Sequence, residues 1–256
     1  MKNHGIRGEE TSDLKVEVNS MSDLVSIVVT TLNEERYIEP CLKALKNQTY
    51  DNKEIIVVDS KSKDKTVEIA RRYADKIIVQ DCIIPAGRNL GAKEARGNIL
   101  LFVDADVTLS PNWINIVLPH LHEDKVIAVY GDLLPNEMKL KSWLAYAREE
   151  LSNLFLRRIR MPCFGKLGTA VAIKKVAFKK VGGFAEDYAC CDDVNLSLRL
   201  REYGRMKFIR NAKGYVSMRR FEKNGYLKQS LLWQWTGSSY ILTRKTPLHR
   251  YSRDFP

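Results

Sequence analysis

The sequence predicts an α/β fold in which a mostly parallel central sheet is flanked by helices on both faces. Two observations lead to this prediction. In the first half of the chain, short apolar runs rich in β-branched residues alternate with helical segments, an order typical of parallel sheets. These runs lack the apolar–polar alternation of half-exposed strands, so we expect strands that are buried on both faces. The second half loses this rhythm and predicts a mixed continuation of the same domain.

Four strands and three helices are expected up to residue 104. The first strand, LVSIVVTT, precedes a helix over NEERYIEPCLKALKNQ, which has apolar residues on one face. The second strand, EIIVVDS, precedes a helix that Ser62 or Asp64 can cap. After the third strand, KIIVQ, a helix over PAGRNLGAKEARG has Pro85 near its start and stops at Gly97. The fourth strand is NILLFVDAD.

The rest of the chain predicts a mixture of helices and strands. After SPNWINIVLPHL and VIAVYGD we expect a long amphipathic helix over KLKSWLAYAREELSNLFLRRIRM, then a glycine-containing loop and a strand in CFGKLGTAVAIKK. A helix over DDVNLSLRLREYG ends at Gly204, MKFIRN is a short strand, and GYLKQSLLWQWTGSSYILTRK has helical spacing. We predict a polar N-terminal extension over 1–22, a main domain over 23–222, and a basic amphipathic C-terminal helix and tail over 223–256.

Composition limits the class of protein. With 256 residues, 45% of them hydrophobic, the chain can bury a sizeable core. No apolar run approaches the ~18 residues that span a bilayer, and the polar N-terminus lacks the apolar region of a secretory signal. Five cysteines without a Cys-x-x-Cys pair favour reduced thiols, so we expect a cytoplasmic protein.

The distribution of charge favours an anionic partner. The formal net charge is +11, and from Arg199 to the C-terminus 14 Lys/Arg stand against 3 Asp/Glu. A basic C-terminal face is typical of binding to phosphate, lipid headgroups or nucleic acid, although it can also be an ordinary solvated surface. No nucleic-acid recognition motif is present, so we expect no nucleic-acid partner.

Acidic and polar residues follow the expected strands at one edge of the sheet. In ILLFVDADVTLS, a buried strand stops at Asp104 and Asp106, while Asp59 ends the second strand and Thr30 and Asn33 end the first. Ligands of open parallel sheets bind beyond these carboxyl ends. One or two carboxylates together with substrate phosphates are the usual ligands of Mg²⁺ or Mn²⁺. The alternative is that Asp106 only begins a turn.

Five motifs in order resemble family 2 glycosyltransferases, which have the GT-A fold, a Rossmann-like sheet. They are VSIVVTTLNEERYIEPCLKALKNQTY, EIIVVDSKSKDKTVEIA, GRNLGAKEARGNILLFVDADV, VGGFAE and DDVNLSLRLREYG, within residues 24–220. The resemblance implies an inverting transfer of a sugar from a nucleotide-diphosphate donor. A similar fold also serves nucleotidyltransferases, which make nucleotide sugars; against that alternative, no Gly-rich phosphate loop lies near the first strand.

The resemblance also implies roles for individual residues. Asp59 matches the aspartate that hydrogen-bonds the nucleobase of the donor; the alternative is that Asp59 caps a turn. Asp104-Ala105-Asp106 matches the Asp-x-Asp motif that holds a divalent metal, Mn²⁺ or Mg²⁺. Arg88 matches a basic position near the donor; otherwise it is a surface arginine. The residues expected at a UDP- or GDP-sugar donor are Thr30, Asn33, Glu34, Asp59, Arg88, Asp104 and Asp106.

A general base is expected in DDVNLSLR. Asp193 matches the family's catalytic base, which takes the proton of the acceptor hydroxyl. Its neighbour Asp192 is expected on the acceptor side, with stabilisation of the helix N-terminus as the alternative for both. Gly168 is also expected to shape the acceptor side.

The chain departs from the family pattern in two places. DSKSKDKT stands where relatives often have a second acid and a glycine, so the resemblance does not specify which nucleobase the donor carries. YVSMRRFEKNG lacks the histidine that can complete the metal site in many relatives. Arg219 and Arg220 can instead pair with the leaving diphosphate; the alternative is a solvated basic loop.

Two expected helices combine apolar and basic residues. LAYAREELSNLFLRRIRM contains Arg157, Arg158 and Arg160, and YLKQSLLWQWTGSSYILTRK groups leucines with Trp233 and Trp235. Such helices can lie in a membrane interface. We therefore expect a peripheral enzyme at the inner face of a membrane, whose acceptor is a lipid-linked or polyprenyl phosphate or a glycan. The alternatives are packing on the sheet and a dimer contact.

Overall fold

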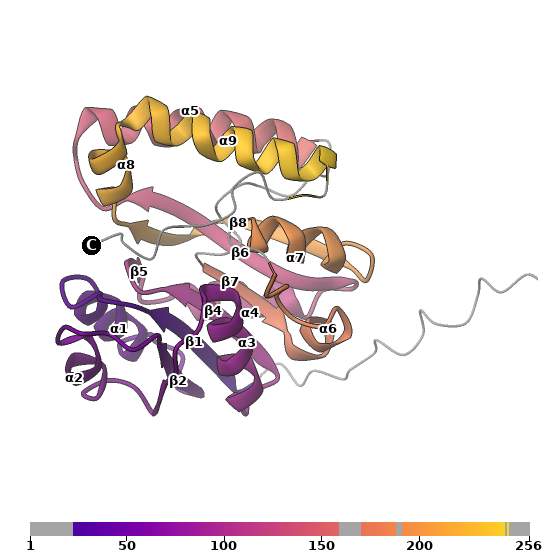
Figure 1. Ribbon diagram of the computed structural model, residues 1–256. Helices are drawn as coiled ribbons and strands as arrows, with labels where there is room; N and C mark the ends of the chain where they lie inside the picture. Colours follow the sequence, from indigo (N-terminus) through magenta and orange to yellow (C-terminus); the bar gives the residue numbers. More distant parts are fainter. Residues whose placement is uncertain (1–22, 159–169, 188–190, 244, 246–256) are drawn as a thin grey trace, which may run out of the picture.

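The computed structural model describes residues 23–158, 170–187, 191–243 and 245, and the described strands form one sheet (Figure 1). The strands are β1 (Val25–Thr31), β2 (Lys53–Asp59), β3 (Lys76–Val79), β4 (Ile99–Asp104), β5 (Val107–Leu109), β6 (Val126–Pro135), β7 (Ala170–Lys174) and β8 (Arg205–Val216). The helices are α1 (Ile38–Lys46), α2 (Thr66–Ala70), α3 (Ile84–Glu94), α4 (Trp113–Leu121), α5 (Leu140–Arg158), α6 (Lys175–Lys180), α7 (Asp192–Leu200), α8 (Arg219–Asn224) and α9 (Tyr226–Thr243).

The order of the strands is β3-β2-β1-β4-β7-β6-β8-β5. The first four of these neighbours are parallel, as expected from the alternating first half of the sequence. On the other side of β4 the sheet is mixed, because β7 is antiparallel to both β4 and β6 and β5 is antiparallel to β8, while β6 and β8 are parallel. The α/β class, the parallel first half and the mixed second half are therefore confirmed.

The two faces of the sheet carry separate hydrophobic cores. Successive side chains of a strand point to opposite faces. In β1, Ile27 and Val29 belong to the cluster that α1, α2 and α4 cover, while Val28 belongs to the cluster beneath α3, α6 and α7. Burial on both faces explains why β1 reads as a continuous apolar run.

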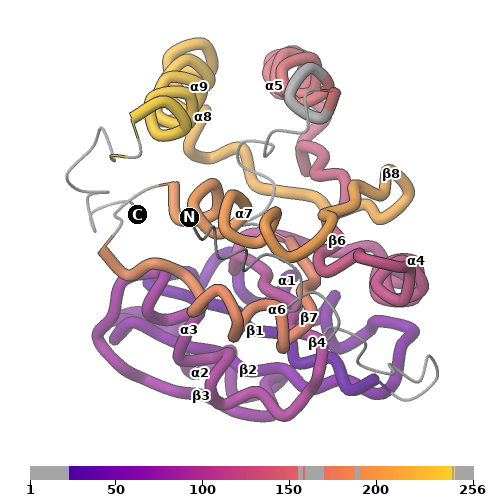
Figure 2. Tube along the Cα trace, turned by 90° about the vertical axis from the view of Figure 1, so that its right-hand side faces the viewer, coloured from indigo at the N-terminus to yellow at the C-terminus, as the bar shows by residue number. Residues whose placement is uncertain are grey.

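Helices α5 and α9 form an outer layer beyond β6 and β8. They lie side by side in both views, with α8 leading into α9 (Figures 1 and 2). Helix α9 packs on α5, α7 and α8, and α5 packs on β6. Among the described helices, none is long and apolar enough to cross a membrane.

The expected stop of the third helix at Gly97 is wrong. Helix α3 ends at Glu94, and Gly97 lies in the turn before β4. A Cβ at Gly97 would stand 2.2 Å from the Leu24 carbonyl oxygen, so the glycine allows a close approach of two backbones. A glycine is required at position 97, but the reason is the close packing of two backbone segments and not the capping of a helix.

Strand β8 is twice as long as the expected MKFIRN, and the three-residue β5 was not expected. Strand β8 first runs parallel to β6 and, after a shift in register, its end also pairs with β5. Pairing on both sides extends a segment whose own sequence is weakly strand-like, NAKGYV. The helix expected to end at Gly204 ends at Leu200.

Candidate active site

The carboxyl ends of β1, β2 and β4 meet at one edge of the sheet. In the register of the strands, Thr30 stands opposite Asp104 and Thr31 stands opposite Asp59. The chain turns at Ala105 and Asp106 before β5 begins. Asp104 and Asp106 therefore lie on one turn at the sheet edge, and Asp106 is both part of a turn and part of this acidic cluster.

A buried arginine connects this turn to helix α7. Arg88, on α3, is 5% exposed and donates to Asp104 Oδ1 at 2.7 Å and to Asp192 Oδ2 at 2.6 Å. Its guanidinium also lies over the Phe184 ring, 5.1 Å from the centroid. Burial opposes its charge, but the two carboxylates raise the pKa of Arg88 above its usual value. The surface-arginine alternative for Arg88 is thus wrong.

Asp193 follows Asp192 in the first turn of α7. The Val194 backbone N–H donates to its Oδ1 at 2.8 Å. Burial, and then the negative charge of Asp192, raise the pKa of Asp193 to about 6. A carboxyl group with that pKa is ionised at neutral pH and can still accept a proton, as a general base requires.

Asp106 lies between acids and arginines. Burial and the charge of Asp104 raise the pKa of Asp106 to about 6, against the opposing effect of Arg220 and Arg219. Arg219 binds the Glu34 carboxylate through both terminal nitrogens and comes within 3.3 Å of Asp106 Oδ2. It also stacks on Tyr37, 4.4 Å from the ring centroid. The solvated-loop alternative for Arg219 is wrong, because Arg219 begins α8 and is an ion-paired, largely buried side chain.

The loop after β1 is joined to the loop after β2. The Asn33 N–H donates to Ser62 Oγ at 2.8 Å, and the Glu34 N–H donates to Thr66 Oγ1 at 2.7 Å. Asp59 is fully buried and accepts hydrogen bonds from the Ser62 N–H at 2.8 Å and from the Ser62 hydroxyl. Both carboxylate oxygens of Asp59 therefore stabilise the turn at Ser62, as expected from the alternative that Asp59 caps a turn.

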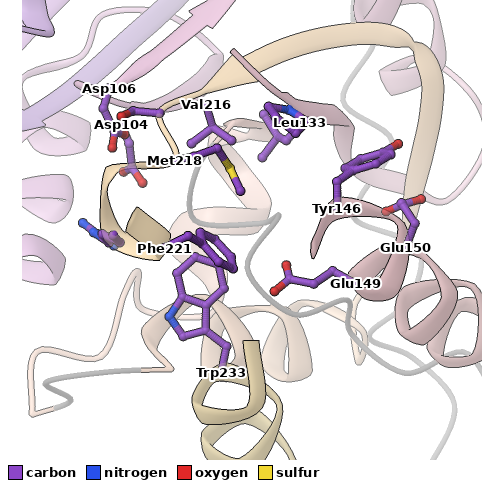
Figure 3. Close-up of a pocket in the computed structure, with 13 residues that line it drawn as sticks. Asp104, Asp106, Leu133, Tyr146, Glu149, Glu150, Val216, Met218, Phe221 and Trp233 are labelled. Carbon is purple, nitrogen blue, oxygen red and sulfur yellow. The ribbon is translucent and has the colours of Figure 1, made fainter. Parts of the chain in front are cut away.

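A pocket opens beside the acidic turn (Figure 3). Asp104 and Asp106 lie on one side of it, and Glu149 and Glu150 lie on the opposite side, on α5. Its other lining residues are Leu133, Pro135, Tyr146, Val216, Ser217, Met218, Arg220, Phe221 and Trp233. Carboxylates beside aromatic and apolar side chains suit a ligand with hydroxyl groups and apolar faces, such as a sugar.

The sequence did not single out the α5 side of this pocket. Tyr146 donates to Asp132 Oδ2 at 2.9 Å, and burial together with the charge of Asp132 raises the pKa of Tyr146. The signal in the sequence was weak: spacings of three and four residues place Tyr146, Glu149 and Glu150 near one another on the helix, but leucines such as Leu154 lie beside them. Trp233, expected in an apolar interface stripe, instead packs on Phe221 with ring centroids 5.1 Å apart and lines the pocket. Gly168 lies outside the described residues.

The acidic turn has the right donors for a hard divalent cation. Among the described residues, no group of three or more His, Cys, Asp or Glu side chains could hold a metal on its own. Asp104 and Asp106 supply carboxylate oxygens, and the raised pKa of Asp106 reflects its burial and then the negative charge of Asp104, which a cation would neutralise. Two carboxylates suffice for Mg²⁺ or Mn²⁺ when substrate phosphates complete the coordination, so these residues fit a metal that binds with its substrate.

Comparison with known proteins identifies relatives of the whole fold. The family model described as Glycosyl transferase family 2 matches residues 26–182. An uncharacterized glycosyltransferase of Rickettsia typhi is 30% identical over 186 residues, covering 70% of this chain and 58% of the relative. An uncharacterized glycosyltransferase of Haemophilus influenzae is 27% identical over 231 residues, covering 82% of this chain and 90% of the relative. The match to EpsH of Bacillus subtilis covers 29% of that protein, so this chain spans less than two thirds of two of these relatives.

Solved structures share the fold at lower identity. Mannosyltransferase PcManGT of Pyrobaculum calidifontis, in complex with GDP-Man and Mn²⁺, has a TM-score of 0.65 at 20% identity, covering 88% of this chain and 66% of that one. S. aureus TarS 1–349 in complex with UDP-GlcNAc has a TM-score of 0.58 at 18% identity, covering 75% and 58%. The architecture is thus the one these glycosyltransferases use.

Proposed function

This chain belongs to glycosyl transferase family 2, and we propose that it is a glycosyltransferase that inverts the anomeric carbon as it moves a sugar from a nucleoside-diphosphate donor to an acceptor. The observation that carries this proposal is the Arg88 bridge, which joins the Asp-x-Asp turn at Asp104 to Asp192, the residue before the proposed base. Donor and base are the two parts that such a transfer must hold in fixed relation.

The donor is proposed to lie along the carboxyl ends of β1, β2 and β4. The nucleoside would contact Thr30, Asn33, Glu34 and Asp59. Its nucleobase would have to compete with Ser62 for the Asp59 carboxylate. A UDP- or GDP-sugar is proposed because TarS was solved with UDP-GlcNAc and PcManGT with GDP-Man.

The diphosphate is proposed to meet Asp106 and Arg220. Arg220 lines the pocket beside Asp106, whereas the terminal nitrogens of Arg219 are already bound to Glu34. Arg220 is therefore the better candidate for a direct phosphate contact, and Arg219 the better candidate for holding Asp106 and Glu34 in place. Mn²⁺ or Mg²⁺, held by Asp106 with Asp104 beside it, would supply charge neutralisation of the diphosphate leaving group.

Asp193 is proposed as the general base. Its side chain would take the proton from the acceptor hydroxyl as the new bond forms, a contribution of about 10²–10⁴-fold. Asp192 is bound to Arg88 and so is proposed to position the first turn of α7 on the acceptor side. In the same proposal Gly168 shapes that side.

The acceptor is proposed to enter the pocket between the acidic turn and α5. Asp193 is not among the residues that line this pocket, so the reacting hydroxyl would have to extend past Asp104 toward the first turn of α7. Trp233 and Phe221 offer an aromatic surface, and Glu149 offers a hydrogen-bond acceptor for hydroxyl groups. We propose a lipid-linked acceptor held close to a membrane: a glycan, whose hydroxyl would give its proton to Asp193, or a polyprenyl phosphate, whose ionised oxygen would react without that step.

One screen tests the activity. Thermal unfolding would be followed with UDP-, GDP- and dTDP-sugars, each with Mn²⁺, Mg²⁺ or chelator, and the release of nucleoside diphosphate would be measured with the sugar that binds. A ligand at a hundredfold excess over its Kd adds about 2.7 kcal/mol to the free energy of unfolding. Release of a nucleoside diphosphate supports glycosyl transfer. Pyrophosphate release, or indifference to every nucleotide sugar, contradicts it.

A further inference from the structure

Helices α5 and α9 expose several large apolar side chains and bury some polar ones. The exposed fraction of Leu151 is 71%, and that of Leu242 is 84%. By contrast Ser142 and Ser230 are buried, at 0% and 1%. The exposed large apolar residues on these helices are Leu140, Leu144, Leu151, Leu154, Leu227, Leu231, Trp235 and Leu242.

On each helix the exposed apolar residues form a stripe. On α5 the stripe runs through Leu140, Leu144, Leu151 and Leu154, and 100° per residue places it roughly opposite Glu149, which lines the pocket. The α9 stripe is likewise roughly opposite the buried residues of that helix. Both stripes therefore point away from the pocket and from the rest of the domain.

Polar contacts hold the two helices in this orientation. Ser230 donates to Glu149 Oε1 at 3.0 Å, and Arg148 donates to Gln234 Oε1 at 2.7 Å. Rotating either helix to bury its leucines would break such contacts and leave polar groups without partners, which is costly. The exposed stripes are therefore a fixed feature of the fold. Helix α5 contacts β6 with its other side, and the alternative that the stripes themselves pack on the sheet is wrong.

The exposed charges beside the stripes have one sign, whereas Glu150, four residues before Leu154, is only partly exposed and lines the pocket. Where the structure describes side chains of α5 and α9, the charged residues at exposed positions are Lys141, Arg158 and Lys228, with no carboxylate among them. An apolar strip between cations complements an anionic lipid surface, which attracts basic residues close to it. A second copy of the same face would bring these cations together, which disfavours a symmetric dimer.

We infer that the α5–α9 face, defined as the two exposed apolar stripes with Lys141, Arg158 and Lys228, docks onto the surface of an anionic lipid bilayer. The leucines and Trp235 enter the boundary between headgroups and acyl chains, and the cations lie among the headgroups. Surface binding does not depend on the sugar chemistry. If the proposed function also holds, docking brings the pocket behind α5 to the membrane, where a lipid-linked acceptor is confined.

Vesicle flotation tests this inference on the full chain. The vesicles are phosphatidylcholine alone or an equal mixture with phosphatidylglycerol. We expect flotation with the anionic vesicles only, and a loss of roughly tenfold or more in bound protein for Leu144→Ser/Leu151→Ser/Leu231→Ser/Trp235→Ser and for Lys141→Glu/Lys228→Glu. The control Val79→Ser/Val176→Ser removes exposed apolar side chains from other elements and should float like wild type.

Three outcomes would overturn the inference. They are failure of the wild type to bind anionic vesicles, flotation of the four-residue variant at the wild-type level, and a dimer in light scattering that only this variant disrupts. The substituted residues are exposed, so we expect each variant to unfold at the same temperature as wild type. A thermal unfolding curve therefore serves as the control that each variant folds. The thermal shift with donor and Mn²⁺ in the absence of lipid reports on the donor site alone, so failure of docking and failure of the proposed function remain distinguishable.

Discussion

Arg88 and Asp192 form a buried ion pair, with Nη1 of the arginine 2.6 Å from Oδ2 of the aspartate. The other terminal nitrogen of the same guanidinium reaches Asp104 at 2.7 Å. One side chain from α3 thus connects the end of β4 to the first turn of α7. The two aspartates that it joins, Asp104 and Asp192, are 88 residues apart in the sequence. This connection sets the distance between the proposed metal turn and the proposed base.

Replacing Arg88 by methionine should destabilise the fold and remove activity. The change leaves two partly buried carboxylates without their partner. Breaking a fully buried pair costs about 3–5 kcal/mol, which is the upper bound for the expected loss. Denaturant unfolding measures the loss, and Arg88→Lys should recover part of it without recovering the bidentate geometry. The control is Arg72→Met, whose partners are exposed, so the expected change is within about 1 kcal/mol. An equal effect of the two methionine variants would contradict the bridging role.

Activity should fall as the pH drops through about 6. The raised pKa of Asp193 means that its carboxylate gains a proton near that pH, and a protonated base cannot accept the acceptor's proton. The pH profile of kcat/KM, taken with saturating metal so that Asp106 stays ionised, should show an acid limb of unit slope in log–log form. In Asp193→Asn the residual rate should lose that limb. A limb that persists in the variant belongs to another group.

Trp233 and Trp235 offer a matched pair on one helix. Trp233 lines the pocket, whereas Trp235 is 55% exposed on the opposite stripe. With a water-soluble acceptor and no membrane, Trp233→Ala should raise the acceptor KM about tenfold or more, a loss of roughly 1.4 kcal/mol of binding. Trp235→Ala should leave the acceptor KM unchanged. Equal effects of the two variants would show that the acceptor does not use this pocket.

The fold was accessible from the sequence because local patterns and burial agree in its first half. Continuous β-branched runs such as VSIVVTT are strands buried on both faces, and parallel order follows from the intervening helices. Strand β8 was underestimated because its second part is held by partners on both sides and not by its own propensity. A single sequence does not contain that tertiary contribution.

The candidate site was partly accessible for a similar reason. Strand ends carry Asp59 and Asp104 to one edge, which topology alone predicts. The Arg88 bridge was not predictable, because α3 and α7 come together only through packing on a shared face of the sheet. The pocket residues Glu149 and Trp233 were hidden by the assumption that an amphipathic helix buries its leucines. Here α5 and α9 do the reverse.

The most direct test is a calorimetric titration of the identified nucleotide sugar with Mn²⁺ into wild type, Asp106→Asn and Asp193→Asn, followed by a turnover assay on the same samples. We expect Asp106→Asn to lose metal-dependent binding. We expect Asp193→Asn to bind like wild type but to transfer about 10²–10⁴-fold more slowly. Asp124→Asn, an exposed acid before β6, controls for the change in charge. Full manganese-dependent binding and turnover in Asp106→Asn, or equal loss of binding in Asp193→Asn, would contradict these expectations.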